Sequence, residues 1–96
     1  PMPQDTGVLT YLAGEPQDGV TPRVGDAIEL RPIGRSRSLE AFTESGQRLG
    51  RLPPDERLAL ARLLPIGAAY VRARIAAVVP RGAAGGARLH ILVPAG

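Results

Sequence analysis

The sequence predicts a mainly β fold, a small and partly closed barrel of about six strands with one principal α-helix. Three observations lead to this prediction. Short segments in which apolar and polar residues alternate recur along the chain, as expected for strands with one buried face. Ten prolines and twelve glycines among 96 residues supply frequent turns between short elements. A single segment carries the proline, acid and leucine pattern of a helix.

The first half of the chain contains four predicted strands, at residues 7–13, 26–31, 39–43 and 48–52. In the second of them, Ile28 and Leu30 flank Glu29, so the two apolar side chains would face the core and the carboxylate would face solvent. Pro32 is expected to end this strand. The turn between the third and fourth strands is short, and these strands should therefore pair as a hairpin.

A helix is predicted next, from Pro54 to Leu64. Proline suits the first helical turn, where its missing N–H would have no partner. The two acidic residues that follow it lie near the positive end of the helix dipole. Pro65 ends the helix. Two further strands are predicted at residues 69–79 and 87–93, joined by a loop of glycine and alanine.

The length of the chain suits one compact domain. Residues 1–6 are predicted to form a polar N-terminal tail and residues 7–96 the domain itself. No stretch approaches the roughly 20 apolar residues that span a bilayer, and the chain does not begin with a secretory signal pattern. Together with the absence of cysteine, this favours a cytoplasmic protein with no membrane contact.

The residue types present give no support to an enzyme. Without cysteine there is no disulfide, thiolate metal site or thiol nucleophile. The single histidine, His90, has no nucleophile or carboxylate at a telling spacing, so it is expected to be a structural or surface residue of a strand. One histidine with scattered carboxylates also makes a poor metal site. We therefore expect no catalytic residues, no metal and no cofactor.

The charged residues favour a nucleic-acid partner. The net charge is +3, and all twelve basic side chains are arginines. Guanidinium groups match phosphate geometry and stack on bases better than ammonium groups do. Tyr70, Arg72 and Arg74 alternate along one face of the predicted strand 69–79, where a tyrosine ring could stack on a base and the arginines could follow phosphates. The alternative is an ordinary solvated strand face.

Several short motifs occur in a characteristic order. They are GDAIELR at 25–31, EAF at 40–42, GQRLGRLP at 46–53, VVPRGA at 78–83 and LH at 89–90. Their order and spacing resemble those of the HIRAN domain over almost the whole chain.

The resemblance implies an OB-like barrel that binds nucleic acid. Similar domains in eukaryotic remodelling enzymes capture 3′ ends of single-stranded DNA at damaged or stalled forks, and bacterial members occur as small stand-alone proteins. The resemblance therefore implies a role in DNA repair. Any helicase or nuclease activity would belong to a partner protein.

The resemblance also implies where DNA would bind. Tyr11 lies near the binding position of the first strand, and Arg81 stands where an aromatic residue of the family follows Val-Val-Pro. Ser38 stands where the family has an aspartate before its Ala-Ile pair. With the other arginines and the tyrosine considered above included, the expected nucleic-acid-binding residues are Tyr11, Arg35, Arg37, Ser38, Arg51, Tyr70, Arg72 and Arg81.

The predicted function is thus a non-enzymatic module that binds single-stranded DNA or DNA ends through arginine–phosphate contacts. Two alternatives stay open at this point. One is a protein-interaction or adaptor module that binds no nucleic acid. The other is a structural domain that forms oligomers by pairing an exposed strand edge, and the sequence leaves the oligomeric state undetermined.

We expect DNA binding to depend less on a free 3′-hydroxyl than it does in the eukaryotic relatives. Ser38 accepts a weaker hydrogen bond than the aspartate it replaces, because it carries no charge. Arg35 and Arg37 would instead attract any phosphate. The measurement compares one oligonucleotide with a free 3′-hydroxyl and the same strand with a 3′-phosphate, at fixed salt. A preference for the hydroxyl of about tenfold or more would contradict this expectation, since it would require another placed acceptor.

Overall fold

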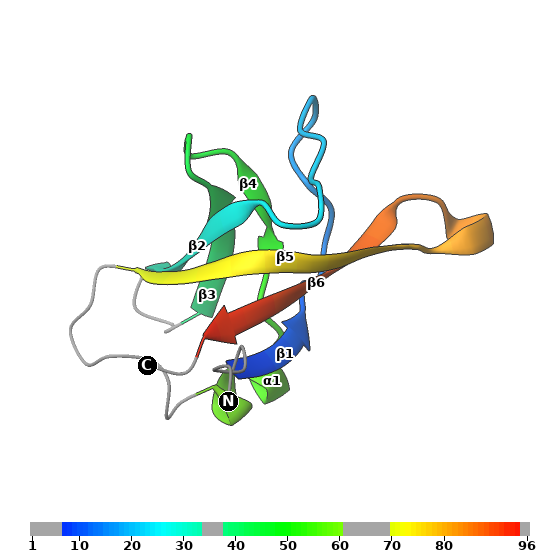
Figure 1. Ribbon diagram of the computed structural model, residues 1–96. Helices are drawn as coiled ribbons and strands as arrows, with labels where there is room; N and C mark the ends of the chain where they lie inside the picture. Colours follow the sequence, from blue (N-terminus) through cyan, green and yellow to red (C-terminus); the bar gives the residue numbers. More distant parts are fainter. Residues whose placement is uncertain (1–6, 34–37, 61–69, 95–96) are drawn as a thin grey trace, which may run out of the picture.

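The predicted mainly β fold, a small and partly closed OB-like barrel with one helix, is confirmed. The computed structural model describes residues 7–33, 38–60 and 70–94. In these ranges a six-stranded antiparallel sheet has the strand order β1-β6-β5-β2-β3-β4 (Figure 1). The strands are β1 (Gly7–Tyr11), β2 (Ala27–Ile33), β3 (Ser38–Thr43), β4 (Arg48–Arg51), β5 (Val71–Pro80) and β6 (Ala87–Pro94).

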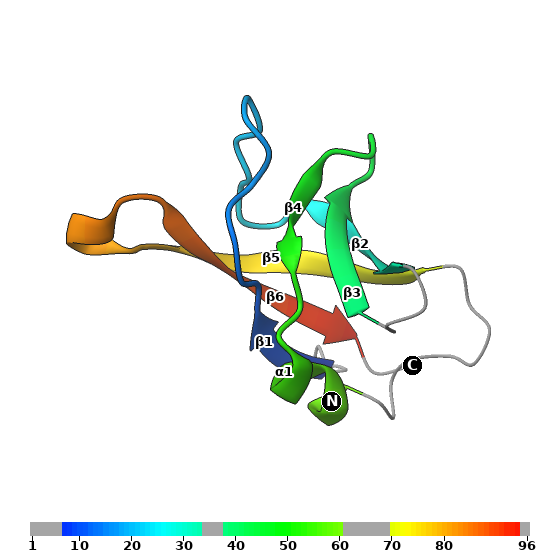
Figure 2. The ribbon, with the colours of Figure 1, turned by 180° about the vertical axis from the view of Figure 1, so that it is seen from behind.

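The sheet curls until its two outer strands meet. Beyond β1 the chain continues beside β4, where Ala13 and Arg51 exchange two backbone hydrogen bonds of 2.8 and 2.9 Å. The backbone N–H of Gln17 also donates to the Arg48 carbonyl over 2.8 Å. Figure 2 shows this segment running alongside β4. Because the pairing is limited to these few residues, the barrel is only partly closed.

The inward-facing side chains of the strands form one hydrophobic core. The strict alternation within β2 buries Ile28 and Leu30 and turns Glu29 outward, as the sequence predicts. Most of the remaining core comes from the other strands and the segments beside them, namely Leu12, Leu39, Ala41, Leu49, Leu52, Leu60, Ala73, Ile75, Leu89, Ile91 and Val93.

Pro32 does not end its strand, contrary to the prediction. It lies within β2, opposite Leu39 of β3. The Leu39 carbonyl accepts a hydrogen bond from Leu52, so the backbone polar groups of Leu39 face β4 rather than β2. The Pro32 nitrogen therefore points away from β3, to the side where pairing with β5 has already ended at Leu30. A proline is tolerated there because no residue of the described ranges pairs with Pro32 on that side.

The helix begins where the sequence predicts. α1 (Pro54–Ala59) carries Asp55 and Glu56 in its first turn, and its predicted end at Leu64 lies outside the described residues. The buried Thr10 hydroxyl of β1 donates to Glu56 over 2.5 Å, which fixes the helix against the barrel. No helix in the described ranges is long and apolar enough to cross a membrane.

β5 and β6 extend beyond the barrel as a long hairpin arm (Figure 1). Pairing between β2 and β5 stops at Ala27 and Arg74, whereas β5 continues alongside β6 as far as Pro80. A β-bulge between Ile75 and Ala77 shifts the register at the base of the arm. The short 3-10 helix η3 (Gly82–Ala84) forms its tip. We refer to residues 76–90 as the hairpin arm.

We predict that Gly50→Ala opens the barrel at its closing contact. Gly50 has a φ of 151°, and a Cβ there would lie 2.7 Å from the Ala13 carbonyl oxygen. Backbone strain and this clash should together lower the free energy of unfolding by about 2–4 kcal/mol, measured by urea denaturation. The control is Gly46→Asn, at a turn with open space around it, which should cost about 1 kcal/mol or less. Equal losses in the two variants would contradict the prediction.

Candidate nucleic-acid interface

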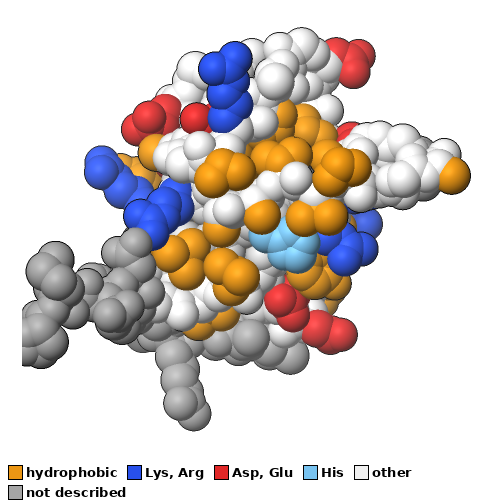
Figure 3. Space-filling view, turned by 45° about the vertical axis from the view of Figure 1, so that its right-hand side comes forward, with side chains coloured by type: hydrophobic (Ala, Val, Ile, Leu, Met, Phe, Trp, Pro, Cys, Tyr) orange, Lys and Arg blue, Asp and Glu red, His pale blue; other side chains and the backbone are white. Residues whose placement is uncertain are grey.

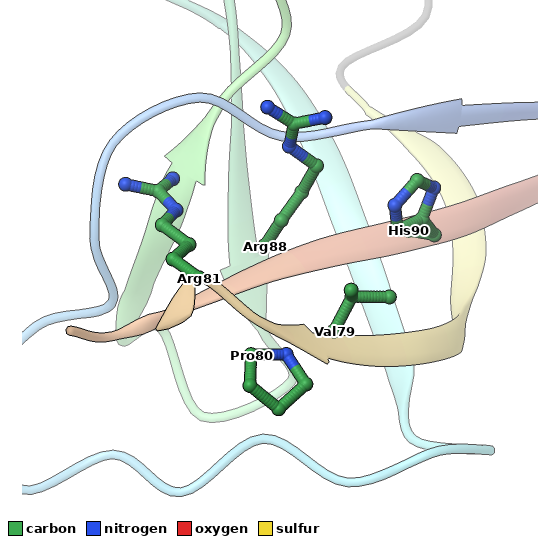
Figure 4. A pocket seen from close by; sticks show the side chains of 5 residues that line it. All are labelled: Val79, Pro80, Arg81, Arg88 and His90. Carbon is green, nitrogen blue, oxygen red and sulfur yellow. The ribbon is translucent and has the colours of Figure 1, made fainter. Parts of the chain in front are cut away.

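An open pocket of about 390 Å³ lies on the outer face of the hairpin arm, lined by Val79, Pro80, Arg81, Arg88 and His90 (Figure 4). We call it the arginine pocket. The strand register explains its composition, because residues directly opposite each other in an antiparallel pair project to the same face. Val79 is opposite Arg88 across the arm. His90 is opposite Tyr11 on β1, so Tyr11 joins the same face.

Arg88 is stacked on an aromatic ring. Its guanidinium carbon lies 4.9 Å from the centroid of the Tyr11 ring, within the range of a cation–π interaction. The planes of the Tyr11 and His90 rings are tilted by 47° relative to each other, with centroids 6.3 Å apart. No carboxylate in the described ranges forms an ion pair with Arg88. Among the described residues, Arg88 therefore presents a positive charge that no carboxylate pairs with.

Arg81 crosses from the hairpin arm to the loop between β1 and β2, residues 12–26, which we call the β1–β2 loop. It donates to the Glu15 carboxylate over 2.9 Å and to the Gly14 carbonyl over 3.2 Å. Because 52% of the Glu15 side chain is exposed, the ion pair is open to water and is worth about 1 kcal/mol or less. The Arg81 Nε atom is buried and has no hydrogen-bond partner among the described residues.

Exposed apolar side chains adjoin the arginine pocket. Figure 3 shows the single histidine among apolar side chains, with basic side chains beside it. Leu9 is 62% exposed, and the period of two along β1 places it on the same face as Tyr11. This surface thus combines positive charge with apolar area, which are the two properties that a nucleotide needs from a binding site.

A second group of predicted residues lies on the outer face of β4 and the start of β5. Arg51 is separated from Arg72 by the two strands β2 and β3. Tyr70, directly before β5, is 39% exposed, and its hydrogen bond raises the pKa of Arg72 above the ordinary arginine value. Tyr70 therefore lies beside Arg72 on this face.

Acidic residues neutralise much of the charge on this second face. Glu29 forms an ion pair with Arg31, and Glu40 binds Arg48 over 2.8 Å. The Arg31 guanidinium also lies 5.1 Å from the Phe42 ring centroid. Arg31 and Arg48 already have anionic partners within the protein, which weakens their attraction for phosphate.

The structure divides the predicted binding residues among different places. Arg81 lines the arginine pocket and Tyr11 adjoins it through Arg88 and His90, whereas Arg51, Tyr70 and Arg72 lie on the second face. Ser38 is the first residue of β3, opposite Ile33 at the end of β2. Arg35 and Arg37 lie outside the described residues.

Sequence reasoning missed Arg88 and His90 as binding residues. Both residues alternate with apolar residues in the predicted strand 87–93, which places them on its polar side. The simplest interpretation of that side was a surface exposed to solvent, not a binding site. The missing information was the register of the hairpin arm, which sets Arg88 opposite Val79. The nearby Tyr11 belongs to a strand almost eighty positions earlier, and no local pattern connects the two.

The described ranges contain no group of three His, Asp or Glu side chains placed to hold a metal ion. Comparison with protein-family models, with curated proteins and with solved structures gives no match for this chain. The geometry of the arginine pocket is therefore the basis for assigning a function.

Proposed function

We propose that this protein is a nucleic-acid-binding module that holds single-stranded DNA or a DNA end against the arginine pocket. The observation that carries the proposal is the convergence of Arg81, Arg88 and His90 on one pocket, with Tyr11 beneath Arg88. The volume of about 390 Å³ is within the range of small-ligand pockets and suits one nucleotide unit.

The chemistry of the pocket suggests how a strand would bind. The guanidinium of Arg88 is planar, so its face turned away from Tyr11 could stack on a base while its N–H groups donate to a phosphate. Arg81 could exchange its exposed carboxylate partner for a phosphate, which would also offer an acceptor near its unpartnered Nε. Val79 and Pro80 would contact the sugar or base through their apolar surface.

The sequence adds independent support. Tyr11 and Arg81 are positions to which the HIRAN resemblance assigns DNA contacts; Arg81 lines the pocket, and Tyr11 contacts Arg88 and His90, which also line it. The HIRAN relationship, the role in DNA repair and a partner helicase or nuclease stay predictions. Because the proposed contacts are mainly to phosphate, we expect little sequence preference and a strong dependence on salt. An adaptor that does not bind nucleic acid would lack this salt-dependent binding.

We predict that Arg88→Gln and Arg81→Gln each weaken binding of a fluorescein-labelled oligothymidine. Each loss should be about 3–10-fold, and the slope of log affinity against log salt should become shallower by about one unit, as for a lost phosphate contact. Fluorescence anisotropy at several salt concentrations measures both effects.

The matched control is Arg48→Gln, which removes an arginine that Glu40 already neutralises on the second face. It should change the affinity by about twofold or less, because no phosphate contact is lost. If Arg48→Gln weakens binding as much as Arg88→Gln does, the nucleic acid binds elsewhere and the proposal is wrong.

We further predict that Glu15→Gln strengthens oligonucleotide binding. The Glu15 carboxylate competes with phosphate for Arg81, and its removal should raise the affinity about 2–5-fold at low salt. The free energy of unfolding should change by about 1 kcal/mol or less, since the ion pair is exposed. Asp18→Asn, in the same loop, serves as control and should have no such effect. Weaker binding by Glu15→Gln would contradict the proposed competition.

A further inference from the structure

The hairpin arm has a second groove, on the face opposite the arginine pocket. This groove has a volume of about 320 Å³ and lies between the arm and the β1–β2 loop. Val78, Ala87 and Leu89 line it from the arm, and Pro16 and Val20 line it from the loop. We call it the loop groove. Its walls are mainly apolar.

The charge of the loop groove is opposite to that of the arginine pocket. Glu15 and Asp18 belong to its lining, which contains no basic side chain. Glu15 is engaged by Arg81, whereas Asp18 is exposed and forms no ion pair among the described residues. An occupant with an apolar group and a neighbouring positive charge would therefore fit this groove best.

An open strand edge adjoins the loop groove at Val78. The backbone N–H of Leu12 donates to the Leu89 carbonyl, so the polar backbone groups of Leu89 face β1. Val78 is opposite Leu89, and its own N–H and carbonyl must then point away from β6. The contacts of β5 with the segment before β2 end at Ile75. No residue of the described ranges pairs with the backbone of Val78 on that side.

This edge lacks charged side chains, which are one of the usual protections against strand addition. Residues 76–80 read Ala-Ala-Val-Val-Pro and carry no charge, whereas exposed edges in monomeric proteins commonly bear charged side chains. Val78 is 36% exposed. Pro80 limits the edge to a short one, because it offers a carbonyl but no N–H.

We propose that the β5 edge and the loop groove together bind an extended protein segment that carries basic residues. The segment would add a short strand beside Val78, place an apolar side chain in the groove and direct a basic side chain to Asp18. Only a polypeptide supplies backbone donors and acceptors in the spacing of a strand. A second copy of this chain fits less well, because its 76–80 segment is uncharged and Arg81, the base that follows it, is already paired with Glu15.

The test uses a defined peptide and the whole chain. The probe is a blocked, fluorescent heptapeptide, Lys-Val-Arg-Leu-Lys-Val-Arg. It should bind at least about tenfold more tightly than the version with glutamate at every basic position, because like charges across an interface are strongly unfavourable. Methylation of alternate peptide nitrogens should abolish binding, since it removes the donors of the added strand. Amide shift changes in NMR spectra should centre on Val78.

Two matched variants separate the two faces of the hairpin arm. Val78→Lys places a cation at the open edge and should weaken binding of the basic peptide about tenfold or more. Val79→Lys introduces the same group at a residue that is 43% exposed on the opposite face, and it should change peptide affinity by about twofold or less. Oligonucleotide binding by Val78→Lys should equal that of the unchanged protein.

Three results would overturn the proposal. The first is equal binding of the basic and acidic peptides. The second is an equal loss of peptide affinity in the two lysine variants. The third is a concentration-dependent dimer that Val78→Lys abolishes, because this result would assign the edge to a second copy. Each of these leaves the proposed nucleic-acid function intact, because oligonucleotide binding is measured separately and depends on the other face of the arm.

Discussion

The contact between Ala13 and Arg51 is the constraint on which both surfaces of this protein depend. These two residues exchange backbone hydrogen bonds and join the outer strands of the sheet. The same contact holds the start of the β1–β2 loop against the barrel, so Gly14 and Glu15 lie within reach of Arg81 on the hairpin arm. Without closure, the arginine pocket would lose its link to the loop and the loop groove would lose one wall.

The hairpin arm presents two chemically different faces because of its register. Val78 and Val79 are neighbours in the sequence but project to opposite sides of the arm. Val79 shares its side with Arg88, and Val78 shares its side with Leu89. The bulge between Ile75 and Ala77 matters here, because one inserted residue reverses the direction of every side chain that follows it.

The distribution of acidic residues, more than the number of arginines, distinguishes the surfaces of the barrel. Glu29 and Glu40 neutralise arginines on the face of β2, β3 and β4. Arg88 has an aromatic ring as its neighbour instead of a carboxylate. A guanidinium stacked on a ring keeps its full charge and leaves its hydrogen-bond donors available to a ligand.

The sequence by itself determined the features that depend on near neighbours. Alternation of apolar residues located the strands, and Pro54 with the acids after it located the start of the helix, because these signals act over a few residues.

The sequence also marked Tyr11 and Arg81 as candidates for nucleic-acid binding. Only the tertiary structure decided what they contact: Arg81 binds Glu15, 66 residues earlier in the chain, and Tyr11 lies under Arg88. The same holds for Pro32, whose place within β2 depends on the pairing of β2 with its two neighbouring strands. Strand order and register arise from the packing of the whole core, and they alone placed Arg88 over Tyr11.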